Sequence, residues 1–293
     1  MRDNAVKKTE PVAMDCALKG LFDYAGMFPP AGLGLEQAVL TYREYGQSDH
    51  AYTLGCLVVN AKELDALKDE LREDVRDVQL SVVAAADDLE AIERHFHEGM
   101  PIKLIEMKAT GPEQVRRLRD VRPAGVAAYV ELPMDLKSLD VADAVAEAGL
   151  HAKLRMGGVV AEAFPTSAQV AAMLNELFKR GLAFKATAGL HHAVRGRYPF
   201  TYREDSERGM MHGFMNLLCA AALVWFGGEE DEVTELLEEE GLLAFRVTEH
   251  SIRWRDFDWS AGELREVREN FLKSIGTCSF IEPIRDVEAL GWL

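Results

Sequence analysis

A strand-then-helix unit recurs along most of this sequence, and it constrains the fold more than any other feature. Six apolar runs begin near residues 53, 78, 102, 125, 151 and 182, with 23 to 31 residues between successive starts. Each of the first five is followed by a charged segment of helical period, such as residues 61–73 or 112–120. Strands that are apolar along their whole length and alternate with helices are typical of a parallel sheet covered by helices.

Two further segments complete the set of strands. Residues 18–24 predict a first strand that ends near Asp23, and residues 245–254 (FRVTEHSIRW) predict the eighth. Residues 260–275 predict the last helix, with Ser260 as its N-cap. Eight strands with eight principal helices favour a (β/α)8 TIM barrel over an open, doubly wound sheet.

The barrel is expected to be a single domain over residues 1–293, because no shift in composition marks a second one. Residues 1–12 are expected to form a flexible tail. Residues 189–205 are polar and follow the seventh strand, so we expect them to form a long active-site loop.

The charge and composition of the chain limit which classes of molecule it is expected to bind. A formal net charge of −16 argues against general binding to nucleic acid or to a membrane surface, although a few local arginines can still bind an anionic small molecule. The four cysteines are far apart, and neither a signal peptide nor a membrane-length apolar stretch is present. We therefore expect a soluble, reduced, cytoplasmic protein with a small-molecule substrate, and the sequence leaves homo-oligomer formation open.

Charged side chains gather at the predicted carboxyl ends of the strands, where barrel enzymes carry their chemistry. The candidates are Asp23, Glu106, Glu131, Lys153, Arg155, Lys185 and Thr187. Two lysines on adjacent strands favour imine chemistry, because one lysine must lose its proton and a nearby cation lowers its pKa. Glu131 or Glu106 could then move protons.

The two lysine segments also resemble a known family. Lys153-Leu-Arg-Met-Gly157, followed by Lys185-Ala-Thr-Ala-Gly189, is similar to the paired lysine strands of class I (Schiff-base) aldolases of deoxyribose-phosphate aldolase type. The resemblance covers about residues 150–190. It implies an aldolase-like lyase with Lys153 as the imine-forming residue and Lys185 as its activator, and it places an acid on the fourth strand, where Glu106 lies.

The sequence departs from that family in two places. Leu154-Arg155-Met156 replaces a Thr/Ser run, and FRVTEHSIRW lacks the family's Gly-Ser phosphate loop. These departures argue against a phosphorylated sugar as the substrate.

Basic residues follow the seventh strand closely in an otherwise acidic chain. We expect His191, His192, Arg195, Arg197 and Arg203 to bind an anionic substrate, together with residues at the strand ends. The candidates at the strand ends are Asp23, Arg155 and Thr187.

Two alternatives remain open. His191, His192 and His212, with a carboxylate, could ligate a divalent metal in a hydrolase, isomerase or lyase, although no H-x-H or H-E-x-x-H spacing is present. A non-catalytic barrel that binds a small molecule is the other alternative. In the imine interpretation no cofactor is expected.

Overall fold

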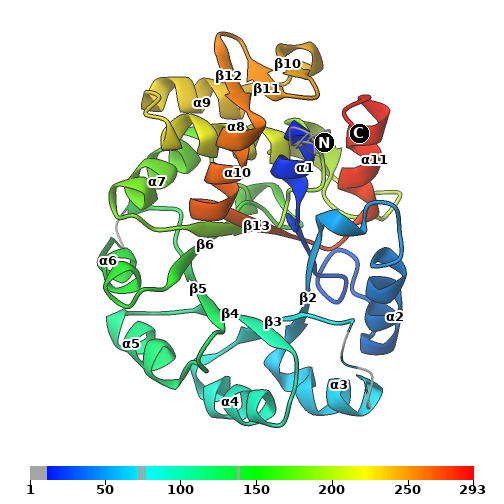
Figure 1. Cartoon of the computed structure of the whole chain (residues 1–293), viewed down its shortest axis with the longest axis vertical. Coiled ribbons are helices and arrows are strands. Elements are labelled where there is room, and N and C mark those ends of the chain that lie inside the picture. The colour runs from blue at the N-terminus through cyan, green and yellow to red at the C-terminus, as the bar shows by residue number, and fades with distance from the viewer. Residues whose placement is uncertain (1–11, 72–74, 76, 137–138) are drawn as a thin grey trace, which may run out of the picture.

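The computed structural model describes residues 12–71, 75, 77–136 and 139–293. Eight parallel strands close into a barrel in which β1 pairs with both β2 and β13. Figure 1 shows the ring of strands with the helices outside it. The strands are β1 (Phe22–Tyr24), β2 (Leu54–Asn60), β3 (Leu80–Ala84), β4 (Ile102–Lys108), β5 (Ala127–Leu132), β6 (His151–Arg155), β7 (Phe184–Thr187) and β13 (Leu272–Thr277). The predicted (β/α)8 barrel is confirmed.

Amphipathic helices cover the outside of the barrel. Several begin with the capping side chains that the sequence offers; Thr166 accepts a hydrogen bond from the backbone of Gln169, and Ser260 accepts one from Glu263. The helices are α1 (Ala13–Leu18), α2 (Leu35–Tyr45), α3 (Leu64–Leu71), α4 (Leu89–His97), α5 (Pro112–Val121), α6 (Leu139–Glu147), α7 (Ser167–Lys179), α8 (Phe214–Trp225), α9 (Glu230–Glu238), α10 (Ala261–Asn270) and α11 (Ile281–Ala289).

The prediction for the eighth strand is wrong. Residues 245–254 form β10 (Phe245–Val247) and β11 (Ser251–Trp254), which join β12 (Phe257–Ser260) in a separate antiparallel sheet. That sheet lies beside the barrel in Figure 1. The eighth barrel strand is β13, which directly follows α10 within the segment predicted as one helix. The alternation of apolar and polar residues in FRVTEHSIRW is explained by an antiparallel sheet that is buried on one face.

The segment after β7 is partly ordered as a hairpin. Strand β8 (Gly196–Pro199) pairs with β9 (Arg208–Met211), so the loop predicted over 189–205 contains regular structure. The predicted first strand is shorter than expected, because residues 13–18 form α1 and only residues 22–24 pair in the barrel. The tail predicted over 1–12 lies outside the described residues except for Val12.

Among the described residues, none of the helices combines the length and the apolar character needed to cross a membrane.

Candidate active site

Two lysines and three carboxylates form a continuous set of ion pairs at the barrel interior, which we call the lysine–carboxylate network. Lys185 Nζ lies 2.7 Å from Asp23 Oδ2 and also pairs with Glu106. Lys153 Nζ lies 2.8 Å from Glu106 Oε2 and 3.3 Å from Glu131 Oε2. The Glu106 carboxylate therefore pairs with both ammonium groups.

Strand register explains why these side chains meet. Lys153 on β6 is paired with Lys185 on β7, and Glu131 on β5 is paired with Lys153. Because alternate residues of a strand face the same side, each strand delivers its charged residue to the barrel interior. The prediction that the two lysines occupy neighbouring strands is confirmed.

Neutral donors complete the network. Ser81 Oγ on β3 donates to Glu106 Oε1 at 2.6 Å, and Ser274 Oγ on β13 donates to Asp23 Oδ2 at 2.7 Å. The backbone N–H of Cys56 donates to Asp23 Oδ1 at 2.8 Å. Each of the two deepest carboxylates thus accepts hydrogen bonds as well as facing a cation, which is what a buried charge requires.

The charge states of the network follow from these contacts. Burial alone would raise the pKa of Glu106, but the ammonium groups of Lys153 and Lys185 outweigh it and hold that pKa well below its usual range. Burial would lower the pKa of Lys185, but Asp23 and Glu106 outweigh it and raise that pKa. The lowered pKa expected of an imine-forming lysine is not found at Lys185, because two carboxylates face this amine and their effect dominates.

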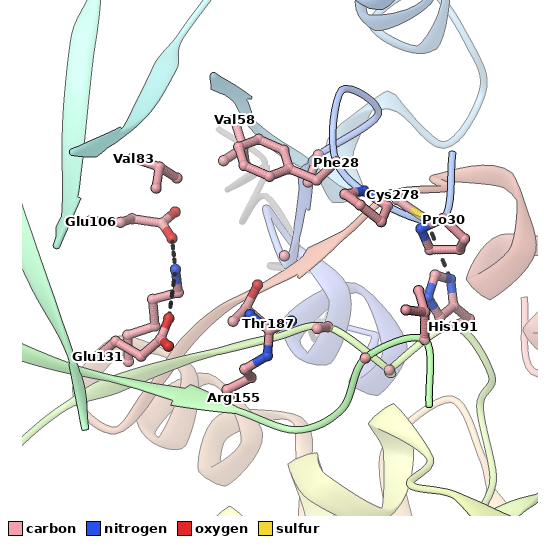
Figure 2. Close-up of a pocket in the computed structure, with 18 residues that line it drawn as sticks. Phe28, Pro30, Val58, Val83, Glu106, Glu131, Arg155, Thr187, His191 and Cys278 are labelled. Carbon is pink, nitrogen blue, oxygen red and sulfur yellow. Dashed lines mark hydrogen bonds and ion pairs between the residues drawn. The ribbon is translucent and has the colours of Figure 1, made fainter. Parts of the chain in front are cut away.

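A cavity of about 320 Å³ opens above the network at the carboxyl ends of the strands. Lys153, Glu106 and Glu131 line it, as do Arg155 and Thr187. Figure 2 shows Glu106 and Glu131 together at one side of this pocket. By contrast, Lys185 is fully buried and Asp23 is 2% exposed, and neither residue lines the cavity.

The rest of the wall is largely apolar or backbone. Phe28 and Pro30 come from the loop after β1, and Val58 and Val83 come from β2 and β3. Ala188, which follows β7 and lines the cavity, has a φ of 64°. A non-glycine residue in this left-handed region is under strain, and such residues are common at functional sites.

A second polar cluster lies at the opposite side of the cavity, where Figure 2 shows His191 beside Cys278. His191 Nδ1 is 3.0 Å from Glu282 Oε2 and 4.0 Å from Cys278 Sγ. Tyr202 donates its hydroxyl to Glu282 Oε2 at 2.9 Å. Burial alone would lower the pKa of His191, but hydrogen bonds to Cys278 and Glu282 raise it to about 9.

Five of the residues expected to bind substrate do not line this cavity: Asp23, which belongs to the buried network, and His192, Arg195, Arg197 and Arg203. Arg197 donates to a backbone carbonyl across the β8–β9 hairpin, and exposed Arg203 pairs with Asp205. His192 instead faces a carboxylate of α11, and Arg195 reaches towards α7. Their part in substrate binding stays a prediction.

The three histidines proposed as metal ligands are not brought together. His212 is buried with Nε2 at 2.8 Å from the carbonyl oxygen of Pro165, whereas His191 and His192 face different carboxylates of α11. Within the described ranges, no group of three or more His, Cys, Asp or Glu residues is placed to hold a metal ion.

The sequence analysis missed several members of the site: Ser81, Ser274, Cys278, Glu282 and Tyr202. A lone hydroxyl in the apolar run of β3 was the available signal for Ser81. Ser274, Cys278 and Glu282 were missed because the last barrel strand was placed too early in the chain. Tyr202 lies in the predicted active-site loop, but its partners Cys278 and Glu282 follow that strand. The argument against a phosphorylated substrate used the wrong loop, because the loop that follows the true last strand is Cys278-Ser279-Phe280. That loop has no Gly-Ser pair either, and the choice of substrate stays a prediction.

Comparison with known proteins does not show which family this chain belongs to. No protein-family model matches the sequence, and no curated protein matches it significantly. Among solved structures, the carboxyl transferase domain of Rhizobium etli pyruvate carboxylase is 14% identical with a TM-score of 0.42, over 61% of this chain and 37% of that one. Nitroalkane oxidase from Streptomyces ansochromogenes is 16% identical with a TM-score of 0.34, over 60% and 61%. A protein of Pseudomonas aeruginosa named as an aldo-keto reductase is 9% identical with a TM-score of 0.31, over 63% and 93%.

Proposed function

We propose that this protein is a lyase of aldolase type that acts next to a carbonyl group through an imine on Lys153. The observation that carries the proposal is the position of Lys153, whose amine joins the buried network yet lines the cavity. An amine that a small molecule can reach, with carboxylates close enough to accept its proton, is what imine formation requires.

The two lysines have different roles in this mechanism. Lys185 is fully buried beneath the cavity, and its raised pKa keeps it protonated at neutral pH. It therefore acts as a fixed positive charge that holds Glu106 and Asp23 in place. Lys153 is the nucleophile because it is the lysine of this pair that a substrate can contact.

The two glutamates also differ. Glu106 stays ionised because its pKa is far below the usual range, so it serves as the counter-ion of both lysines. Glu131 lines the cavity and lies 3.3 Å from Lys153 Nζ with its side chain 17% exposed. We assign Glu131 as the acid/base that takes a proton from Lys153.

The proposed reaction proceeds in balanced steps. Lys153 Nζ, having given a proton to Glu131, attacks the carbonyl carbon, and the C–N bond forms as the C=O π bond breaks. The oxygen then leaves as water after protonation, which gives an iminium. When a C–C bond is broken, the iminium accepts its electron pair and becomes an enamine, while the hydroxyl of the leaving fragment gives its proton to Glu131 and becomes a carbonyl. When a C–O bond is broken, Glu131 instead removes the proton on the carbon between the iminium and that bond, and the resulting enamine expels the oxygen with the electron pair of the C–O bond. Protonation of the remaining enamine, where one is left, and hydrolysis of the iminium by water then release the product and free Lys153. Lys185 and Asp23 do not change their charge in any step.

An anionic substrate fits the cations around the cavity. Arg155 lies on its wall with an exposed side chain, and His191 on the opposite side is cationic at neutral pH because its pKa is about 9. Both groups favour a carbonyl compound that carries a carboxylate or a phosphate.

Borohydride trapping tests the proposal. The protein is incubated with pyruvate or glycolaldehyde, reduced with borohydride and digested for mass spectrometry. We expect a reduced adduct on the peptide that contains Lys153 and none on the peptide that contains Lys185. Because the proposed reaction uses no metal, the yield should be the same in EDTA.

Lys153→Met is the informative variant, because it removes the amine but keeps the length of the side chain. We expect it to abolish the adduct and leave the fold intact, since Glu106 keeps Lys185 and Ser81 as partners. Lys108→Met is the matched control, because Lys108 is an exposed lysine at the end of β4 that does not line this cavity. An adduct that persists in Lys153→Met, or trapping on exposed lysines alone, would refute the imine.

A further inference from the structure

Cys278, Glu282 and Tyr202 have no part in the lysine mechanism, in which His191 serves only to attract the anionic substrate, yet Cys278 and His191 line the same cavity. Cys278 lines the cavity with 7% of its surface exposed. Its Sγ lies 4.0 Å from His191 Nδ1 and 3.5 Å from the hydroxyl oxygen of Tyr202. Both neighbours are held by Glu282, at 3.0 Å from His191 and 2.9 Å from Tyr202.

This arrangement has the parts of an activated thiol. A nucleophile needs a cation or base nearby and a third group that orients that neighbour. Here Cys278 is the nucleophile and His191 is the neighbour. Glu282 pairs with the same Nδ1 that faces the thiol, so the carboxylate fixes the ring and favours its cationic form beside the sulfur. Imidazolium groups beside cysteines stabilise the thiolate, which is the reactive form.

The other thiols of the protein are placed differently. Cys56 and Cys219 are buried, and burial raises the pKa of both. Cys16 is half-buried at the other end of the barrel, where a guanidinium nitrogen of Arg265 lies 3.4 Å from its Sγ. Among the four, Cys278 combines an imidazole neighbour with a cavity wall.

We propose that Cys278 is a second nucleophile of the cavity, which adds reversibly to small carbonyl compounds with the help of His191. The thiolate attacks the carbonyl carbon, so that a C–S bond forms and the C=O π bond breaks. The imidazolium of His191 gives a proton to the carbonyl oxygen, and the product is a neutral thiohemiacetal. No oxidant or reductant is consumed. Glu282 acts as a positioning residue, because it contacts His191 rather than the reacting atoms.

Alkylation by iodoacetamide measures the reactivity of each thiol without knowledge of the natural substrate. Peptide mass spectrometry follows the four cysteines separately as the C–S bond forms and iodide leaves. At pH 7 we expect Cys278 to react at least about tenfold faster than fully buried Cys219, and His191→Gln to slow Cys278 by about tenfold or more. The rate at Cys16 should not change.

The pH dependence of the rate adds a test of positioning. The titratable groups that face Cys278 are His191, Tyr202 and Tyr24, and Glu282 acts through the first two. Glu282→Gln should raise the pH at which Cys278 reaches half of its maximal rate, because the imidazolium loses its carboxylate partner. Tyr202→Phe keeps the His191–Glu282 contact and should produce a smaller shift.

Fully buried Cys219 reports folding in the same samples, because it reacts quickly only if a variant unfolds. The carbonyl step is measured in Lys153→Met, where no imine on that residue competes: millimolar glycolaldehyde should slow alkylation of Cys278 but not of Cys16. The proposal is overturned if Cys278 reacts no faster than Cys219, if folded His191→Gln leaves the rate at Cys278 unchanged, or if glycolaldehyde gives no protection. None of these results depends on whether Lys153 forms an imine.

Discussion

Replacing Lys185 by Met should show how strongly the lysine–carboxylate network stabilises the fold. The substitution removes one buried positive charge and keeps a side chain of similar length. Asp23 retains Ser274 and the Cys56 N–H as donors, and Glu106 retains Lys153 and Ser81. Hydrogen bonding therefore survives, but one buried negative charge has no cation to compensate it.

The magnitude follows from that uncompensated charge. Removing one partner of a buried ion pair costs about 3–5 kcal/mol. Because both carboxylates keep their donors, we expect Lys185→Met to lower the free energy of unfolding by about 3 kcal/mol, at the lower end of that range. Adding Asp23→Asn should restore at least about 1 kcal/mol, because it removes the unmatched charge and neighbouring residues are energetically coupled.

Urea unfolding followed by circular dichroism measures these differences, with Arg203→Met as the control. Arg203 and Asp205 form an ion pair whose side chains are 77% and 72% exposed. Breaking an exposed pair costs at most about 1 kcal/mol. A Lys185→Met loss no larger than that of the control would refute the reasoning. A double variant less stable than Lys185→Met would show that Asp23 is not the uncompensated charge.

Three further predictions concern the same site. Folding lowers the pKa of Glu106, so its ionised form stabilises the folded protein above the unfolded-state pKa of about 4.3, and this stabilisation is lost as the pH falls. Glu106→Gln should therefore make the free energy of unfolding, measured in urea, depend less on pH in the acid range. The pKa of His191 is raised to about 9, so the stabilisation of the folded protein by the charged imidazole is lost as the pH rises through that value. An NMR titration of His191 with a midpoint near 6.5 would contradict this. Gly55→Ala would place a Cβ 2.3 Å from Asp23 Oδ1 and should cost about 1–3 kcal/mol in thermal unfolding, whereas Gly262→Ala in α10 should be neutral or slightly stabilising.

Most of the barrel could be predicted from the sequence, because buried parallel strands are apolar runs that recur with their helices. The closing strand could not. Residues 260–275 begin with a strong capping signal and continue in helical period, and the helix ends at Asn270 without a glycine or a proline. By contrast, FRVTEHSIRW has the alternation of a strand but forms two short strands, which pair with each other and with β12 outside the barrel; local patterns do not reveal these partners.

The site was predicted in part for the same reason. Lys153, Lys185 and the glutamates are charges on strands that the sequence placed correctly, so parity alone indicated that they would face inwards. Which lysine a substrate can reach depends on how deep each one lies in the barrel, and the alternation of residues along a strand does not indicate that depth. Cys278 could not be associated with His191, because their proximity depends on the strand that was misplaced.

The bond between Ser274 and Asp23 joins residues that are 251 positions apart, across the contact where β1 meets β13 and the barrel closes. Both lysines are therefore synthesised well before the strand that completes their surroundings. Until that strand has left the ribosome and inserted beside β1, Asp23 lacks its serine donor and the interior around Lys185 stays open to water. A nascent or truncated chain that ends before residue 272 carries the reactive side chains but not the dry environment that sets their charge, so the site forms only after β13 has joined the barrel.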